Sequence, residues 1–255
     1  MEKGQLVFGA AGTNPVAGGA LAEYTLVQNN SMAALPEDVD PVDAATVGVA
    51  GLTAYQSIVP NVKKGDRVFI NGGSGGTGVF GIQIAKAVGC HVTTSCSTPN
   101  VDFCKALGAE EVVDYRKGSV AEALKESGVK FDHVVDNVGT DPELYWKCHE
   151  FTKEDALYVM VGSAASWSWV SDTIKRNLIP SVMGGGKRKF TGFTPERSIG
   201  DVGQIAEWMK DGKVRAVIDT KFGFEEAPKA FEKSRTGRAK GKIVVDVASE
   251  TYKSW

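Results

Sequence analysis

The sequence predicts an α/β protein built on a doubly wound parallel sheet, with a smaller β-rich region beside it. Three observations predict this class. Short apolar strands alternate with helices from residue 63 onward, a glycine-rich turn follows the first of these strands, and residues 1–57 lack the alternation. The 255 residues are enough for one large domain or two modest ones. We expect regions 1–57, 58–195 and 196–255.

The first regular element is a buried strand in KKGDRVFINGG, where the apolar run 68–70 lies between turn residues. Residues 78–88 follow as a helix with a broad apolar face, and Gly89 suits its C-terminal end. The β-branched run CHVTTSC predicts a second strand. It leads into a helix in STPNVDFCKALGA, for which Ser97 or Thr98 is the expected N-cap.

The later elements repeat this alternation. EEVVDY predicts a third strand, and GSVAEALKESG predicts a helix that begins with a capping box of Ser119 and Glu122. FDHVVD and ALYVMV predict two more strands, with a helix in TDPELYWKCHEF between them, and KRKFTGF predicts the last strand. Strands that alternate with helices in this way indicate parallel βαβ units with right-handed crossovers.

The flanking regions predict fewer elements. GALAEYTLV predicts a single strand, LPEDVDPVDAAT a loop that leads into a helix, and GLTAYQSI the end of a connecting helix. After residue 213, AVIDTKFGF and GKIVVDVA predict two strands, with a helix around 225–235 between them.

Composition excludes several classes of protein. The net charge is −2 and 24% of the residues are charged, so no nucleic-acid or membrane-surface partner is indicated. No apolar run is long enough to span a membrane, and the first residues lack a secretory pattern. The four cysteines form no CxxC pair, so we expect reduced thiols and no metal site. We expect a cytoplasmic protein, or a mitochondrial one if a preceding segment carries a targeting signal.

The stretch NGGSGGTGVFG, residues 71–81, joins the first strand to the first helix. Gly72, Gly75 and Gly78 would allow a tight turn, close approach of a pyrophosphate, and close packing of the helix on the strand. Free N–H groups at the start of the helix would then face the phosphates. The pattern therefore predicts a dinucleotide site, and the alternative is a turn that binds no ligand.

The end of the second strand bears on which dinucleotide is bound. NAD sites place Asp or Glu there, to bind the ribose hydroxyls. Here TTSCSTPN contains no acid, while Ser97, Thr98 and Asn100 could donate hydrogen bonds to a 2′-phosphate. This favours NADPH. The alternative is that Ser97 and Thr98 serve only as helix caps, and the two roles can coexist.

Five motifs occur in one order along the chain: AGLTAYQSI, GDRVFINGGSGGTGVFGIQIAKAVGCHVTT, ALGAEEVVDY, VVDNVG and GRAKGKIVVDV. The set resembles the medium-chain dehydrogenase/reductases, and most of all their zinc-independent, quinone-oxidoreductase-like branch near the reticulon-interacting reductases and fungal relatives. The resemblance implies a Rossmann cofactor domain at 58–195 and a partial GroES-like catalytic domain at 1–57. Region 196–255 would then hold the last helix of the cofactor domain and the return to the catalytic domain.

The resemblance also implies NADPH-dependent hydride transfer to a quinone or to an activated, enone-type double bond. No catalytic acid can be named from the sequence. The residues that would surround the cofactor are Ser74, Gly75, Gly76, Thr77 and Gly78 at the pyrophosphate, Ser97, Asn100 and Tyr115 at the adenosine 2′-phosphate, Asn137 and Gly139 after the fourth strand, Gly162 and Ser163 near the nicotinamide, Thr53 in the connecting helix, and Arg238, Ala239 and Lys240 in the C-terminal segment.

Three departures from the family pattern qualify these expectations. Many relatives have a basic residue where this chain has Pro99, so one phosphate-binding charge is missing. Zinc-dependent relatives place a Cys just before the connecting helix, where this chain has VGVAGLTAY, which argues against zinc catalysis. The resemblance begins inside the family's first domain, and KGQLVFGAAG resembles a stretch normally preceded by a β-rich segment.

The third departure leaves two functions open. One is an active NADPH-dependent reductase with a small-molecule quinone or enone substrate. The alternative is a catalytically impaired NADPH-binding or interaction protein that lacks part of the substrate domain. By family analogy, a homodimer would form through the edge strand of the Rossmann sheet.

Overall fold

The computed structural model describes residues 2–11, 19–161, 175–176, 178–179 and 181–247. Two compact units make up the chain, and each is described by itself. One unit is Met1–Leu52 together with Glu196–Trp255, and the other is Thr53–Pro195. The second unit ends at the predicted residue 195 and begins a few residues before the predicted boundary at 58.

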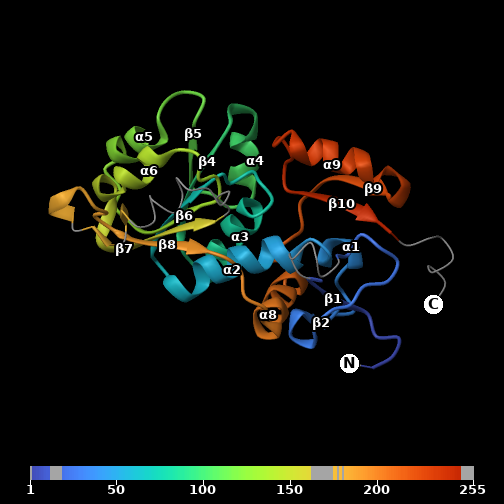
Figure 1. The fold of residues 1–255 in the computed structure, drawn as a ribbon. Coiled ribbons are helices and arrows are strands. Elements are labelled where there is room, and N and C mark those ends of the chain that lie inside the picture. Colours follow the sequence, from blue (N-terminus) through green and yellow to red (C-terminus); the bar gives the residue numbers. More distant parts are fainter. Residues whose placement is uncertain (1, 12–18, 162–174, 177, 180, 248–255) are drawn as a thin grey trace. The chain divides into compact units, whose positions relative to one another are not determined.

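The unit Thr53–Pro195 is built on a six-stranded parallel sheet (Figure 1). Its spatial order is β5-β4-β3-β6-β7-β8. This is the doubly wound order in which the chain begins in the middle, builds one half outward, and crosses back to build the other. The predicted α/β class and parallel sheet are confirmed. The strands are β3 Arg67–Asn71, β4 His91–Cys96, β5 Glu111–Asp114, β6 Phe131–Asp136, β7 Thr152–Val161 and β8 Lys189–Phe193.

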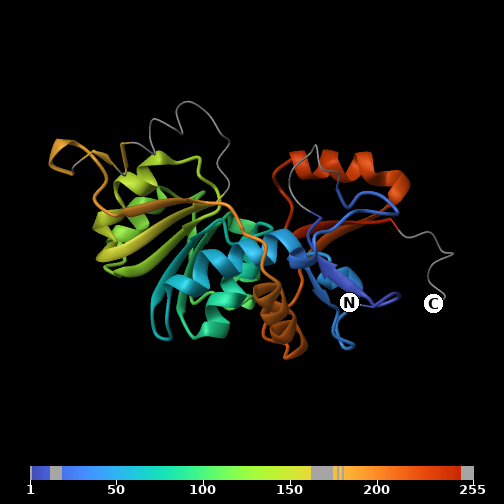
Figure 2. The same ribbon diagram turned by 60° about the horizontal axis from the view of Figure 1, so that its bottom comes forward.

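Helices cover both faces of this sheet (Figures 1 and 2). On one face α3 packs between α2 and β3. Gly81 of α3 lies so close to Ile58 of α2 and Ile70 of β3 that an added Cβ atom would be 3.4 Å from each. On the other face a buried cluster joins Phe69 of β3 with Leu124 of α5 and Tyr145 of α6. The helices of this unit are α2 Leu52–Ile58, which starts at the unit boundary, α3 Gly78–Val88, α4 Val101–Ala106, α5 Val120–Glu126 and α6 Pro142–Trp146.

The other unit has smaller sheets. An antiparallel pair of strands and a parallel pair are the sheets of its described part. Gly48, in a π-helical turn before α2, lies against the backbone of Gly9 so closely that a Cβ atom would be 1.9 Å from the Gly9 carbonyl oxygen. The elements are β1 Val7–Gly9, β2 Met32–Ala34, α1 Pro41–Ala44, α8 Ile199–Lys210, β9 Ile218–Gly223, α9 Ala227–Arg235 and β10 Lys242–Asp246.

Two local expectations were wrong. GALAEYTLV forms no strand in the described chain, and its Tyr24 and Leu26 are 78% and 92% exposed. A strand needs a neighbour to pair its backbone, and the short β1 and β2 pair with each other instead. Helix α4 begins at Val101, after a 3₁₀ turn at 98–100, and the Ser97 side chain makes no capping hydrogen bond within the described residues.

Among the described residues, no helix is both long enough and apolar enough to cross a membrane.

Candidate functional site

The glycine-rich turn leaves the carboxyl end of β3 and enters α3, and its glycines have different surroundings. Gly72 has a φ of +80°, which glycine adopts without strain. A Cβ atom at Gly73 would lie 2.1 Å from the Thr94 hydroxyl oxygen, and one at Gly78 would lie 2.2 Å from the Gly72 carbonyl oxygen. At Gly75 the nearest atom would be 3.5 Å away, so this position is open to a ligand.

Several backbone N–H groups of this turn are already used. Gly73 donates to the Ser95 carbonyl at 2.9 Å, and Gly75 donates to the Gly72 carbonyl at 3.2 Å. Four other N–H groups have no acceptor in the described part of the chain, as expected where a turn runs into a helix start. The four belong to Ser74, Gly76, Thr77 and Gly78. Unused donors at the N-terminus of an eleven-residue helix suit an anionic group such as a pyrophosphate.

A second polar group lies beside this turn, at the end of β4. The Asn100 amide nitrogen donates to the Ser74 hydroxyl at 3.1 Å and to the Ser97 hydroxyl at 3.2 Å. Because both hydroxyl oxygens accept from Asn100, both hydroxyl protons are left to donate elsewhere. The buried Asn100 carbonyl oxygen has no partner among the described residues. The residues predicted at the 2′-phosphate, Ser97 and Asn100, therefore contact one another, and Asn100 reaches Ser74 of the glycine-rich turn.

The end of β5 borders the same region. The Tyr115 N–H donates to the Cys96 carbonyl at 3.1 Å, and the Tyr115 side chain is 51% exposed. Asp114, which the sequence reasoning did not consider, accepts a hydrogen bond from the Arg116 N–H at 3.0 Å. Burial raises the pKa of Asp114, but a hydrogen bond from Thr98 and the Arg116 N–H outweigh it and hold the pKa below its usual value.

The turn after β6 lies beside the glycine-rich turn, since β3 and β6 are neighbours in the sheet. The Asn137 side chain donates to the Asn71 carbonyl at 3.2 Å, and its own buried carbonyl oxygen has no partner in the described chain. Gly139 has a φ of +64°. The position between β3 and β6 is where the strand order reverses, which is the usual ligand crevice of such sheets.

Beneath these turns lies a set of buried polar side chains that the sequence reasoning missed. The carboxylate of Asp136, at the end of β6, accepts from the Asn71 amide at 2.8 Å and from the Tyr158 hydroxyl at 2.7 Å. The Ser95 hydroxyl donates to the side-chain amide oxygen (Oδ1) of Asn71 at 2.5 Å. The only sequence signal was the polar residue that ends each of two apolar strands, Asn71 and Asp136.

The remaining predicted residues are placed as follows. Thr53 is buried on α2, with 4% of its surface exposed. Arg238, Ala239 and Lys240 belong to the other unit, where the Lys240 N–H donates to Asp219, and their role at the cofactor stays a prediction. Gly162 and Ser163 lie outside the described residues.

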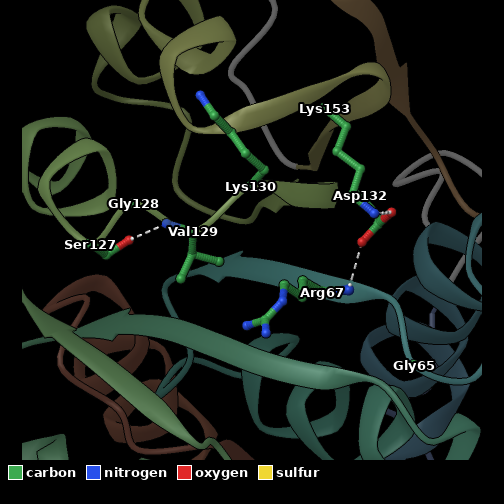
Figure 3. Close-up of a pocket in the computed structure, with 8 residues that line it drawn as sticks. All are labelled: Gly65, Arg67, Ser127, Gly128, Val129, Lys130, Asp132 and Lys153. Carbon is green, nitrogen blue, oxygen red and sulfur yellow. Dashed lines mark hydrogen bonds and ion pairs between the residues drawn. The ribbon is translucent and has the colours of Figure 1, made fainter.

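A pocket of about 430 Å³ lies at the opposite edge of the same sheet (Figure 3). Its two lysines already have partners: Lys153 pairs with Asp132 at 2.5 Å, and Lys130 donates to the Glu150 carbonyl at 2.5 Å. In Figure 3 the Lys130 and Arg67 side chains point away from each other, so they do not converge on one ligand. The lining residues are Gly65, Arg67, Ser127, Gly128, Val129, Lys130, Asp132 and Lys153.

The thiols offer no ready nucleophile. All four cysteines are free and buried. Burial raises the pKa of Cys90 to about 11 and those of Cys104 and Cys148 to about 12, so these stay protonated near neutral pH. Within the described ranges, no three His, Cys, Asp or Glu residues lie together as a metal site would need. Zinc-independent chemistry remains a prediction.

The residues at the carboxyl edge fit a dinucleotide. Free N–H donors at the start of α3 suit the pyrophosphate, and the two serine hydroxyls oriented by Asn100 can donate to the adenosine end. The space above Gly75 leaves room for a phosphate to approach the backbone.

Comparison with known proteins shows which family the chain belongs to. Residues 107–245 match the protein family described as "Zinc-binding dehydrogenase". The trans-enoyl reductase pgmF of Aspergillus terreus is 48% identical over 257 residues, which cover 99% of this chain and 71% of that protein. The mitochondrial NAD(P)H oxidoreductase RTN4IP1 of Danio rerio is 32% identical over 251 residues, covering 91% of this chain and 64% of that protein.

A solved structure gives the same result for the fold. The quinone oxidoreductase from Coxiella burnetii superposes with a TM-score of 0.76 at 30% identity, covering 89% of this chain and 67% of that one. The chain therefore belongs to the zinc-binding dehydrogenase family, which is also called the medium-chain dehydrogenase/reductases. Within this family of nicotinamide-dependent oxidoreductases it belongs to the quinone-oxidoreductase-like branch.

Proposed function

We propose that this chain is an NADPH-dependent reductase of a carbon–carbon double bond conjugated to a carbonyl, or of a quinone. The observation that carries the proposal is a set of donors at the carboxyl edge of the sheet. They are the four N–H groups of the turn, which have no acceptor among the described residues, and the two hydroxyls held by Asn100. The substrate class rests on the fungal trans-enoyl reductase, which matches 99% of this chain.

The chain's own residues bind and orient the cofactor in this proposal. The N–H groups of Ser74, Gly76, Thr77 and Gly78 would hold the pyrophosphate, and Gly75 would leave it room. When bound, NADPH supplies a hydride to the electrophilic carbon, and a proton from water completes the reduction at the neighbouring carbon or at the oxygen. Orientation of the two reactants is then the main contribution of the protein.

The preference for NADPH over NADH rests on charge and hydrogen bonding at the end of β4. A 2′-phosphate needs donors, and the hydroxyl protons of Ser74 and Ser97 are available to it. Ser97 stands at the N-cap position of the 3₁₀ turn at 98–100, but its side chain makes no capping hydrogen bond in the described chain, which supports a role for its hydroxyl at the 2′-phosphate. Arg116 and Lys117, which act electrostatically on Asp114, place two cations near this edge despite Pro99.

One experiment separates this function from a binding protein without turnover. Purified protein is titrated with NADPH by fluorescence, and NADPH oxidation is then measured with an enone and with a quinone. Tight binding and oxidation with either acceptor support the proposal. Binding without oxidation would leave the chain as an NADPH-binding or interaction protein, and the absence of binding would refute both functions.

We also propose that β8 mediates a homodimer. It is the last strand in the order of the sheet, so one side of its backbone has no paired strand in the described chain. Size-exclusion chromatography with light scattering tests this, and a monomer at micromolar concentration would contradict it. A cytoplasmic location and the lack of a nucleic-acid partner stay predictions, and the zebrafish relative is described as mitochondrial.

A further inference from the structure

Four buried polar side chains form a continuous chain of hydrogen bonds across the sheet. They are Ser95 on β4, Asn71 on β3, Asp136 on β6 and Tyr158 on β7, which are four successive strands in the spatial order. Their exposed fractions are 0%, 8%, 0% and 1%, in the same order. We call this set the polar relay. Buried polar groups are costly unless they are paired, so a set of this size needs an explanation.

The donors of the relay converge on Asp136. One carboxylate oxygen accepts from the Asn71 amide at 2.8 Å and from the N–H groups of Val138 and Gly139 at 3.0 Å each. The other oxygen accepts from the Tyr158 hydroxyl at 2.7 Å. All four partners are donors, which suits an ionised carboxyl that can only accept. The side chain therefore fixes the turn after β6 while it holds the end of β3.

The relay also has a direction. Asn71 must turn its amide nitrogen to the carboxylate, which leaves its carbonyl oxygen to accept from the Ser95 hydroxyl at 2.5 Å. The Ser95 oxygen is then free to accept from the Gly72 N–H at 3.0 Å. Each donor points along the relay toward Asp136, and hydrogen bonds aligned in this way strengthen one another.

Both ends of the relay hold backbone that faces the proposed cofactor. Gly72 opens the glycine-rich turn, and the Ser95 backbone carbonyl accepts from the next residue, Gly73, at 2.9 Å. Val138 and Gly139 form the turn after β6. Burial, and then the nearby Asp136 carboxylate, raise the pKa of Tyr158 well above its usual value, which keeps its hydroxyl a donor.

We propose that Asp136, Asn71, Ser95 and Tyr158 act as positioning residues that lock the two cofactor-facing turns into one arrangement. Breaking the relay at one end then loosens both turns and weakens NADPH binding, although none of the four side chains needs to touch the cofactor. This inference rests on the proposed function for the identity of the ligand, but not for the locking of the turns.

The test uses full-length variants and two measurements. Ser95→Ala and Tyr158→Phe each remove one hydroxyl from opposite ends of the relay. Ser57→Ala is the matched control, because its buried hydroxyl donates only to the Ala54 carbonyl of its own helix, at 3.1 Å. Amide exchange at Gly72, Val138 and Gly139 is measured in the free protein, and the dissociation constant of NADPH is measured by fluorescence.

We expect Ser95→Ala to raise the NADPH dissociation constant about tenfold and to speed exchange at Gly72 by a similar factor. Because the relay couples the two turns, the same variant should also speed exchange at Val138 and Gly139, by a smaller factor. Tyr158→Phe should produce a smaller change in the same direction at Val138 and Gly139. Their effects on the dissociation constant should fall short of additive, since either change breaks the same relay. Ser57→Ala should lower the melting temperature comparably and leave both exchange and affinity as in the natural protein.

Asp136 is tested with two substitutions. Asp136→Ala leaves all four donors without their acceptor. Asp136→Asn keeps one side-chain oxygen, which can still accept from the Asn71 amide and from the N–H groups of Val138 and Gly139. We expect Asp136→Asn to recover most of the affinity that Asp136→Ala loses. If Asp136→Ala does not fold, the two hydroxyl variants still decide the question.

The outcomes distinguish this inference from the proposed function. Faster exchange at the turns in Ser95→Ala supports the relay even if the natural protein binds no NADPH, in which case only the proposed function fails. Unchanged exchange at Gly72, Val138 and Gly139 in both hydroxyl variants overturns the relay, whether or not NADPH binds. Faster exchange with unchanged NADPH affinity also overturns it as a positioning device for the cofactor.

Discussion

The polar groups at the carboxyl ends of strands β3 and β6 differ from those at their amino ends. At the carboxyl edge, Asn71 and Asp136 are buried and bond each other, and the backbone above them keeps N–H groups without acceptors in the described chain. At the amino edge, Asp132 accepts from the Arg67 N–H at 2.9 Å and pairs with the half-exposed Lys153. The amino edge holds the pocket of about 430 Å³, yet its lysines are paired within the protein.

A pocket by itself therefore does not identify a functional site. A ligand site needs groups that the protein leaves unsatisfied and holds in place, and the carboxyl edge has both. An exposed ion pair such as Lys153 with Asp132 contributes little to stability and offers little to a ligand.

The largest effect is expected at Gly75. A Cβ atom there meets only the Gly72 carbonyl oxygen, at 3.5 Å, so Gly75→Leu should fold normally. Its side chain would fill the space above the turn, and we expect NADPH affinity to fall by about a hundredfold or more, with little change in melting temperature. Fluorescence titration checks this. An unchanged dissociation constant would show that NADPH does not occupy the space above Gly75.

Gly78→Ala should instead lower the stability of the folded protein. Its Cβ atom would lie 2.2 Å from the Gly72 carbonyl oxygen, so the turn or the start of α3 has to shift. We expect a loss of about 2 kcal/mol in the free energy of unfolding, measured with denaturant. Equal stability of the natural protein and this variant would contradict the packing of the helix against the turn.

Ser97→Ala should change the choice between nicotinamide cofactors. Removing one hydroxyl that is held by Asn100 should weaken NADPH binding about tenfold and leave NADH binding nearly unchanged. The ratio of the two dissociation constants is the measurement. An equal loss for both cofactors would mean that Ser97 does not contact the 2′-phosphate.

His133 should make stability depend on pH. It is fully buried, its Nε2 atom lies 2.7 Å from the Ser57 carbonyl, and burial lowers its pKa below the usual 6.5. As the pH falls through that usual value, the unfolded chain gains a proton that the folded chain does not, so stability is lost toward acid at up to about 1.4 kcal/mol per pH unit.

Denaturant unfolding at about pH 7.5 and about pH 5.5 measures this dependence. Burial, and then the nearby Lys187, also lower the pKa of His149, so this residue contributes in the same direction. The variant His133→Asn isolates the effect of His133, because it removes only that titration. A pH dependence as steep in the variant as in the natural protein would assign the effect elsewhere.

The smallest effect is expected at the amino edge. Lys153→Ala removes an exposed ion pair with Asp132, so we expect a stability change within about 0.5 kcal/mol and no change in NADPH affinity. Thermal melts and fluorescence titration check this. A large loss of NADPH affinity would mean that the two edges are not independent.

Much of the sheet could be predicted from the sequence. The strand FDHVVD and the helix 78–88 have the predicted bounds, and Gly89 ends that helix with a φ of +94°. Their signals are local, an apolar run or a helical period followed by glycine. GALAEYTLV has the same kind of local signal, but the described chain gives it no strand to pair with.

The sequence by itself determined the α/β class, the glycine-rich turn between β3 and α3, and the serines and asparagine beside it, because these depend on neighbouring residues and on chain order. The tertiary structure alone decided which polar groups are left free and which are locked. Ser95, Asn71, Asp136 and Tyr158 are separated along the chain by 24, 65 and 22 residues, and they meet only through the order and register of four strands. Side-chain contacts of this kind have no local signal, since a shift of one residue in register would turn each side chain to the other face.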